Sequence, residues 1–172
     1  MLDCIVPDEL IQDFDKDRPE DLYLITDLYP VYRDIVKAIN PASVLEIGSR
    51  YGYSLAVALD AGSQITRAVS VDMVSGVAQY GGVQGAVSVM EANLRAMQPV
   101  RWPLVHFDFY DINTQLVSSL PFSGPFDLIY VDGDHSPLGC LHDLFLTYPL
   151  LSPSGFLVVD DMDWHPELRG PV

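Results

Sequence analysis

Lysine is scarce in this sequence, and acidic residues far outnumber basic ones. The 172 residues include 9 Lys and Arg against 24 Asp and Glu, so the net charge is −15 with the four histidines neutral. The two lysines are Lys16 and Lys37, and none follows residue 37. Because binding to nucleic-acid phosphates needs clustered basic side chains, no nucleic-acid partner is expected.

Cysteines and long apolar runs are also few. Cys4 and Cys140 are the two cysteines, and neither belongs to a Cys-x-x-Cys pair, which excludes a disulfide framework and a zinc knuckle. The longest apolar runs, such as Phe156–Val159, fall far short of the roughly 20 residues that cross a bilayer. The N-terminus is acidic and lacks the basic start of a secretory signal. We therefore expect a cytoplasmic protein with no membrane partner.

The composition is that of a folded chain. Hydrophobic residues make up 49% and charged residues 19% of the sequence, the reverse of the balance found in disordered chains. The length fits one domain. We expect a single domain over residues 1–172, with a lead-in segment over 1–26 and a core over 27–165.

Short apolar runs alternate with helical patterns along this core. Helices are predicted over 27–39, 54–60, 83–97, 113–120 and 138–151, and strands over 44–47, 68–71, 104–107, 126–131 and 156–159. The strands are apolar throughout, which is typical of parallel strands buried on both faces. The sequence therefore predicts an α/β fold, a doubly wound and mostly parallel sheet with helices on both faces.

An acidic residue stands at the end of every predicted strand. These acids are Glu46, Asp72, Asp108, Asp132 and the pair Asp160 and Asp161. Since ligands bind at the carboxyl ends of strands in open α/β sheets, the acids should converge on one edge. Each one alone could simply start a loop or cap a helix. Together they would repel one another unless hydroxyls, cations or a metal lie between them.

The first predicted strand leads into a turn that contains two glycines. Gly48 and Gly52 permit a tight turn and a close approach of the backbone to a ligand. The dinucleotide fingerprint Gly-x-Gly-x-x-Gly is absent because residue 50 is Arg50, and no phosphate-binding P-loop follows. Asp72 lies 20 residues beyond Gly52, where a carboxylate would bind the two hydroxyls of a ribose. A nucleoside ligand without an essential pyrophosphate is expected.

Over roughly residues 27–165 the chain resembles the class I S-adenosylmethionine-dependent methyltransferases. In that family strand 1 carries an acid-x-Gly-x-x-x-Gly motif, an acid ending strand 2 binds the ribose, and a polar residue after strand 3 often meets the adenine. The resemblance implies a Rossmann-like fold and S-adenosylmethionine as the cofactor. The residues that it assigns to the cofactor are Glu46, Gly48, Ser49, Gly52, Asp72, Asp108 and Asp132.

A second motif, Phe-Asp-Leu-Ile-Tyr-Val-Asp-Gly-Asp-His-Ser over residues 126–136, resembles the metal-dependent O-methyltransferases of the catechol and macrolide-sugar types. There, acids after strands 4 and 5 hold Mg²⁺, which implies Asp132, Asp160 and Asp161 as ligands. The general base stands three residues after the first of these acids, which implies His135. A lysine base from this region is impossible because no lysine follows residue 37. The ordinary pKa of histidine suits a general base. The resemblance thus implies Mg²⁺-assisted O-methyl transfer to a small hydroxylated molecule.

Other interpretations stay open beside this one. The main alternative is a non-catalytic S-adenosylmethionine-binding domain or a degenerate methyltransferase, and a less favoured one is an NAD-dependent oxidoreductase. His135 could cap the following helix instead of acting as a base. Asp134 is expected to orient the loop or cap the helix, and His106 to lie in the core. His142 and Asp143 are expected on the surface of a helix.

The resemblance ends at the fifth strand. The family sheet normally has seven strands, whereas 11 residues follow Asp161 here, so we expect strands 6 and 7 to be lacking. The strand over 156–159 would then form an exposed apolar edge, which favours pairing with another chain. A homo-oligomer through this edge is therefore expected.

Overall fold

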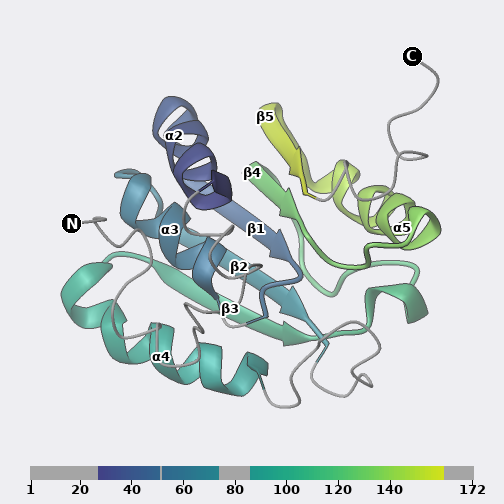
Figure 1. Cartoon of the computed structure of the whole chain (residues 1–172), viewed down its shortest axis with the longest axis horizontal. Helices are drawn as coiled ribbons and strands as arrows, with labels where there is room; N and C mark the ends of the chain where they lie inside the picture. Colours follow the sequence, from purple (N-terminus) through teal and green to yellow (C-terminus); the bar gives the residue numbers. More distant parts are fainter. Residues whose placement is uncertain (1–26, 51, 74–85, 161–172) are drawn as a thin grey trace.

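Strands and helices alternate along the part of the chain that the structure describes (Figure 1). The computed structural model describes residues 27–50, 52–73 and 86–160, and of residues 86–89 the backbone alone. The helices are α2 (Tyr29–Ile39), α3 (Tyr53–Ala61), α4 (Ala86–Arg101) and α5 (Pro137–Thr147), with the 3₁₀ turns η3 (Thr114–Leu116) and η4 (Tyr148–Leu150). The strands are β1 (Ser43–Ile47), β2 (Arg67–Asp72), β3 (His106–Asp111), β4 (Phe126–Val131) and β5 (Leu151–Val159). None of the described helices is long and apolar enough to span a membrane.

The five strands form one parallel sheet in the order β3-β2-β1-β4-β5. Strand β1 lies in the middle, with β2 on one side and β4 on the other. Its last residue, Ile47, is in register with Val71 of β2 and with Val131 of β4. The prediction of a parallel α/β sheet from the continuous apolar runs is therefore confirmed.

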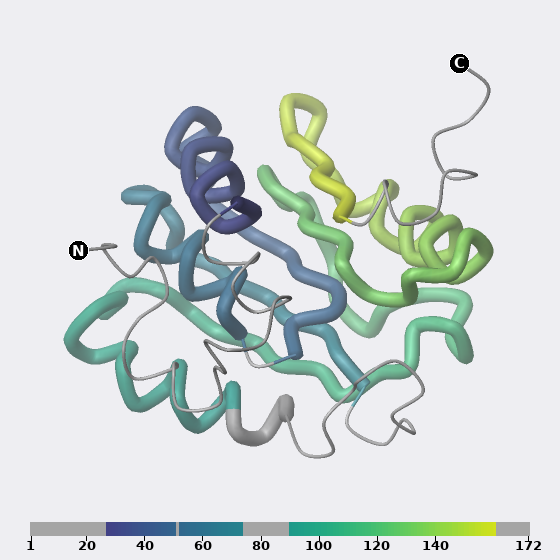
Figure 2. The backbone as a smooth tube through the Cα atoms, in the orientation of Figure 1, coloured from purple at the N-terminus to yellow at the C-terminus, as the bar shows by residue number. Residues whose placement is uncertain are grey.

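Two apolar layers cover the two faces of the sheet. On one face α2, α3 and α4 pack against strand residues such as Val44 and Leu128. On the other face Leu144 of α5 packs against residues such as Leu45 and Ile129. Figure 2 shows α5 beyond β4, apart from the other three helices. The doubly wound arrangement with helices on both faces is thus confirmed.

The helices follow from local sequence. Tyr29, Tyr32 and Val36 of α2 recur at helical spacing and are all buried, while the intervening positions are more exposed. Helix α2 is capped by Asn40, which adopts a left-handed conformation and donates its backbone N–H to the carbonyl of Val36. Helix α3 is buried from Tyr53 through Leu59, so no polar stripe marks it in the sequence.

Several boundaries differ from the sequence prediction. Strand β3 runs over 106–111 and not over 104–107, because it pairs with all six residues of β2. The helix predicted over 113–120 is limited to the short turn η3. Strand β5 begins at Leu151 and pairs with β4 across a register shift. The lead-in over 1–26 and the glycine-rich segment over 76–85 lie outside the described residues.

One carboxylate joins the starts of β1 and β4. Oδ2 of Asp127 accepts hydrogen bonds from the backbone N–H groups of Ala42 (3.0 Å) and Ser43 (3.1 Å), and from the Ser43 hydroxyl (3.1 Å). The Ser43 hydroxyl oxygen in turn accepts a bond from the Asp127 N–H. These bonds fix the register of the two central strands, although 84 residues separate the partners.

Candidate active site

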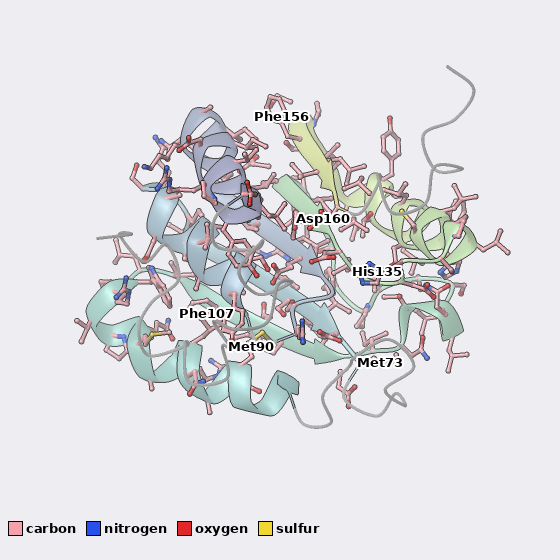
Figure 3. The ribbon with its side chains drawn as sticks, in the orientation of Figure 1. Met73, Met90, Phe107, His135, Phe156 and Asp160 are labelled. Carbon is pink, nitrogen blue, oxygen red and sulfur yellow. The ribbon has the colours of Figure 1, made fainter. Side chains whose placement is uncertain are left out.

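The carboxyl ends of the strands meet at one edge of the sheet. Strand β1 has β2 on one side and β4 on the other, so the strand order reverses at β1, which is the usual ligand position in this architecture. Figure 3 shows His135 and Asp160 toward this edge, with Phe156 toward the other end of β5. Most of the acidic residues predicted from the sequence converge here.

The turn between β1 and α3 depends on its glycines. Gly48 (φ 88°), Arg50 (φ 45°) and Gly52 (φ 83°) all have left-handed backbone conformations. A side chain at Gly48 would run into the backbone carbonyl of Asp132, so the turn passes directly against the loop that follows β4. The predicted tight turn with a close backbone approach is confirmed, and the close neighbour in this structure is the β4 loop.

Glu46 is a fully buried acid beneath this turn. Its Oε1 accepts a hydrogen bond from the Ser54 hydroxyl (2.5 Å), while Oε2 has no hydrogen-bond partner among the described residues. Burial raises the pKa of Glu46 from 4.5 to about 7, against the opposing hydrogen bonds from Ser54 and Ser49. Ser49 is also buried and its hydroxyl bonds that of Ser70. A buried acid with an open oxygen atom suits a ligand that donates hydrogen bonds or carries positive charge.

Asp72 lies next to the same turn, as the spacing predicts. Its Oδ2 accepts a bond from the backbone N–H of Arg50 (2.5 Å), and its Oδ1 accepts one from the N–H of Met73 (2.6 Å). Burial raises the pKa of Asp72, and these two bonds oppose that effect. Because each carboxylate oxygen can accept a second bond, Asp72 keeps acceptor capacity for hydroxyl donors.

The prediction that Asp108 ends the third strand is wrong. Asp108 lies inside β3 opposite Val69 and does not end the strand. Its Oδ1 lies 3.4 Å from Nε2 of His106, whose side chain is 77% exposed and therefore not in the core. Asp111 ends β3 and is in register with Asp72. Polar and apolar residues alternate over 106–109, with Phe107 buried, and this pattern could have revealed a strand that continues beyond residue 107.

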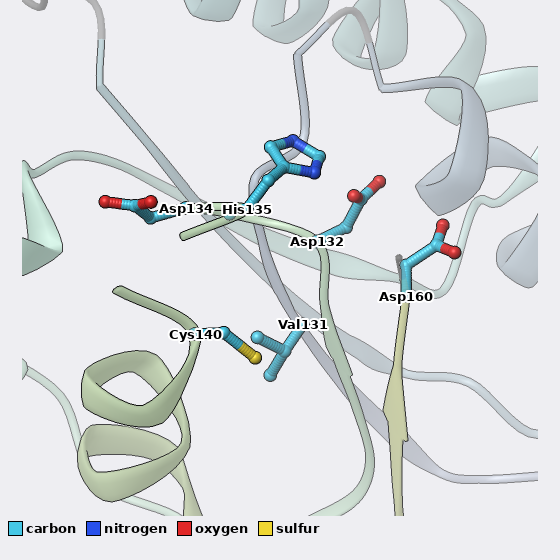
Figure 4. A pocket seen from close by; sticks show the side chains of 7 residues that line it. Val131, Asp132, Asp134, His135, Cys140 and Asp160 are labelled. Atoms are coloured by element: carbon cyan, nitrogen blue, oxygen red, sulfur yellow. The ribbon is translucent and has the colours of Figure 1, made fainter. Parts of the chain in front are cut away.

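A hollow opens between the ends of β4 and β5 (Figure 4). It is lined by Val131, Asp132, Gly133, Asp134, His135, Cys140 and Asp160. The side chains of Asp132 and Asp160 lie beside each other in Figure 4, with the ring of His135 on the same side. The structure thus brings together the predicted base and two of the three predicted metal ligands.

Two tyrosines support the Asp160 side of this hollow. The Tyr130 hydroxyl donates to Oδ2 of Asp160 (2.5 Å), and the Tyr130 ring stacks on Tyr32 of α2 with centroids 4.5 Å apart. Burial, reinforced by the nearby Asp132 and Asp160 carboxylates, raises the pKa of Tyr130, so this tyrosine remains a neutral donor. Asp160 is thereby fixed at the end of β5.

Two of the three predicted metal ligands, Asp132 and Asp160, lie among the described residues. Among residues 27–50, 52–73 and 86–160, no three potential ligands gather closely enough to hold an ion, and Asp161 lies outside these ranges. The donors present, Asp132 and Asp160, are carboxylates that face one hollow, and carboxylate oxygens are the ligands that Mg²⁺ prefers. The chemistry of this donor pair therefore fits a hard cation.

The loop after β4 is fixed by its own polar residues. Oδ1 of Asp134 accepts from the Ser136 N–H (2.8 Å), and the Ser136 hydroxyl accepts from the Gly139 N–H (3.1 Å). Ser136 is thus the N-cap of α5, while Asp134 orients the loop, as expected. Asp143, expected at the helix surface, is fully buried beneath this loop, which corrects that prediction.

The fold and this site together define a class I methyltransferase core, with the glycine turn after β1, an acid at the end of β2 and acidic loops after β4 and β5. The sequence model of the family described as "methyltransferase domain" matches residues 45–162. The chain belongs to this methyltransferase-domain family.

Solved structures support the assignment of the fold. The methyltransferase PaMTH1 of Podospora anserina, solved with S-adenosylhomocysteine, superposes with a TM-score of 0.61 at 18% identity, over 90% of this chain and 62% of its own. The O-methyltransferase TomG of Streptomyces achromogenes, solved with S-adenosylmethionine, gives 0.61 at 20% identity, over 95% and 66%. The chain therefore spans about two thirds of the length of these proteins or slightly less. No curated protein matches the sequence.

Proposed function

We propose that this chain binds S-adenosylmethionine at the loops after β1 and β2 and transfers its methyl group to a hydroxyl oxygen of a small molecule. The observation that carries the proposal is the meeting of three features at one edge: the left-handed turn at Gly48, the carboxylate of Asp72 and the hollow that contains His135. TomG and PaMTH1, solved with this cofactor or its product, share the fold and support the proposal.

The cofactor half of the site is assigned to the first two loops. Asp72 would accept hydrogen bonds from the ribose hydroxyls, through the lone pairs that the backbone leaves open. Gly48 lets the backbone approach the ligand without a side chain in between. Glu46 offers a buried oxygen atom to the cationic or donor end of the cofactor. S-adenosylmethionine, when bound, supplies an electrophilic methyl group.

The acceptor half is assigned to the hollow between β4 and β5. His135 would remove the proton from the attacking hydroxyl, so that the oxygen can bond to the methyl carbon as the sulfur–carbon bond breaks. Asp132 and Asp160, with Asp161, would hold Mg²⁺. A bound Mg²⁺ lowers the pKa of a hydroxyl that it contacts.

The test is calorimetric titration with S-adenosylhomocysteine, followed by an assay with hydroxylated acceptors with and without Mg²⁺. We expect saturable binding that Asp72→Ala weakens by about 10-fold or more, since two hydrogen bonds to a charged group would be lost. His135→Ala should abolish transfer and leave the binding affinity within about twofold, because the base acts in transfer and not in cofactor binding.

Each result decides between the alternatives. Binding without turnover over a broad acceptor panel would support a non-catalytic binding domain. Full activity of the His135→Ala variant would show that His135 is not the base. A well-folded protein that does not bind S-adenosylhomocysteine would refute the proposed function.

We also propose that the chain pairs with a second copy through β5. Among the described strands, β5 pairs with β4 alone, and its residue Phe156 is 53% exposed. An apolar edge strand of this kind is prone to pair with another chain. Light scattering should give the mass of a dimer, and Phe156→Glu should give a monomer. A monodisperse wild-type monomer would refute this proposal.

A further inference from the structure

Helix α5 carries a charged side chain in an unexpected place. Asp143 has no exposed surface, and it lies on the side of the helix that faces the loop after β4. Burying a carboxylate costs several kcal/mol unless hydrogen bonds compensate for the lost water. The partners of Asp143 therefore indicate what the residue does.

Asp143 accepts hydrogen bonds from two separate loops. Its Oδ2 accepts from the backbone N–H of Asp134 (3.2 Å), in the loop after β4. Its Oδ1 accepts from the side-chain amide of Gln115 (3.2 Å), in the turn η3 after β3, and the Thr114 side chain adds another bond. Gln115 also donates to the carbonyl of Gly139 (3.4 Å), in the first turn of α5. One buried carboxylate thus ties the loops after β3 and β4 to α5.

The contact with the β4 loop is close. A side chain at Gly133 would place its Cβ 2.6 Å from Oδ2 of Asp143, so the carboxylate fills the space where that side chain would lie. The held segment, Gly133 and Asp134, lies between the two residues assigned to the chemistry, Asp132 and His135. Any shift of this segment would move both of them.

We propose that Asp143 is a positioning residue for methyl transfer. It holds the loop over residues 132–135 in place and does not touch a substrate. This inference rests on the proposed function, because it takes His135 as the general base. A role in stability alone would predict a different result: the folded variant would be less stable but would retain its turnover number.

The test compares Asp143→Ala with the conservative Asp143→Asn. The alanine variant leaves the Asp134 N–H without its acceptor, and we expect kcat to fall roughly 30- to 100-fold, as a displacement of about 1 Å can cause. The affinity for S-adenosylhomocysteine should stay within about twofold, because the β1 and β2 loops are untouched. Asparagine can keep its side-chain oxygen toward the Asp134 N–H and gives up the bond from Gln115, so kcat should recover to within about fivefold of wild type.

Asp34→Asn is the matched control, since the Asp34 side chain is 66% exposed on α2 and far from the loop in sequence. Its kcat should equal that of wild type. A folded Asp143→Ala variant with wild-type kcat would overturn the proposal, and so would equal losses in the asparagine and alanine variants.

A second readout keeps the test independent of activity. The imidazole resonances of His135 report the surroundings of the ring, and Asp143→Ala should shift them while Asp34→Asn should not. If the wild type turns over no acceptor, the proposed function fails, and this spectrum still decides whether Asp143 positions the loop. Unchanged His135 resonances in a folded Asp143→Ala variant would overturn the positioning role.

Discussion

Replacing Glu46 by glutamine should make the protein more stable at alkaline pH. Burial holds the pKa of Glu46 at about 7 in the folded chain, against 4.5 in an unfolded one. The folded state therefore binds this proton more tightly, and the free energy of unfolding falls as the pH rises from the lower value to the higher. Glutamine has nearly the same shape and does not titrate, so the Glu46→Gln variant escapes this loss.

The size of the effect follows from the two pKa values. Their difference corresponds to about 3 kcal/mol of lost stability once Glu46 is fully ionised. About 2 kcal/mol of this loss develops between about pH 5.5 and about pH 8.5, since part of it is already present at the lower pH. The carbonyl of glutamine can still accept the bond from the Ser54 hydroxyl, so the pH-independent difference should be small.

Urea unfolding of both proteins at four pH values across this range measures the effect. The stability advantage of Glu46→Gln should grow with pH by about 2 kcal/mol. Glu91→Gln is the control, because the Glu91 side chain is 40% exposed and pairs with Arg95 on the surface of α4. Its difference from wild type should stay within about 0.5 kcal/mol at every pH. A constant difference for Glu46→Gln, or one that shrinks with pH, would refute the reasoning.

Two further predictions concern the two ends of β1. Gly48→Ala should destabilise the protein by roughly 2–4 kcal/mol in urea unfolding, since its methyl group would meet the Asp132 carbonyl at a left-handed φ; a loss below about 1 kcal/mol would contradict the described turn. Asp127→Ala should lower stability by about 2–3 kcal/mol, because the Ser43 and Ala42 donors lose their acceptor; an unchanged midpoint would show that these bonds do not hold β1 to β4.

Local chemistry explains why one half of the site could be predicted from the sequence. Gly48 and Gly52 are needed wherever a chain turns sharply from a strand into a helix, so their positions mark the turn without any tertiary information. Strands that run parallel bring their carboxyl ends together, which places Asp72 beside that turn.

The remaining features depend on contacts between distant segments. The end of β3 is set by the six residues of β2 with which it pairs. The acid at the carboxyl end of the strand is therefore Asp111 and not Asp108. The burial of Asp143 depends on donors in η3 and in the β4 loop, which nothing in the composition of α5 reveals. A polar residue within a helix is exposed by default, and a distant donor alone reverses that expectation.

The central pairing of β1 with β4 also has a consequence for the order of folding. The two strands are neighbours in the sheet, yet Ser43 and Asp127 are 84 residues apart in the chain. During synthesis β1 therefore leaves the ribosome well before β4, and the backbone edge of β1 that pairs with β4 stays unpaired until β4 is made. Closing so long a loop delays the central contact, so β1 and β2 should form an early pair that is completed only when β4 joins it. The residues that would bind the cofactor thus belong to the first strands made, and they reach their final surroundings only after β4 arrives.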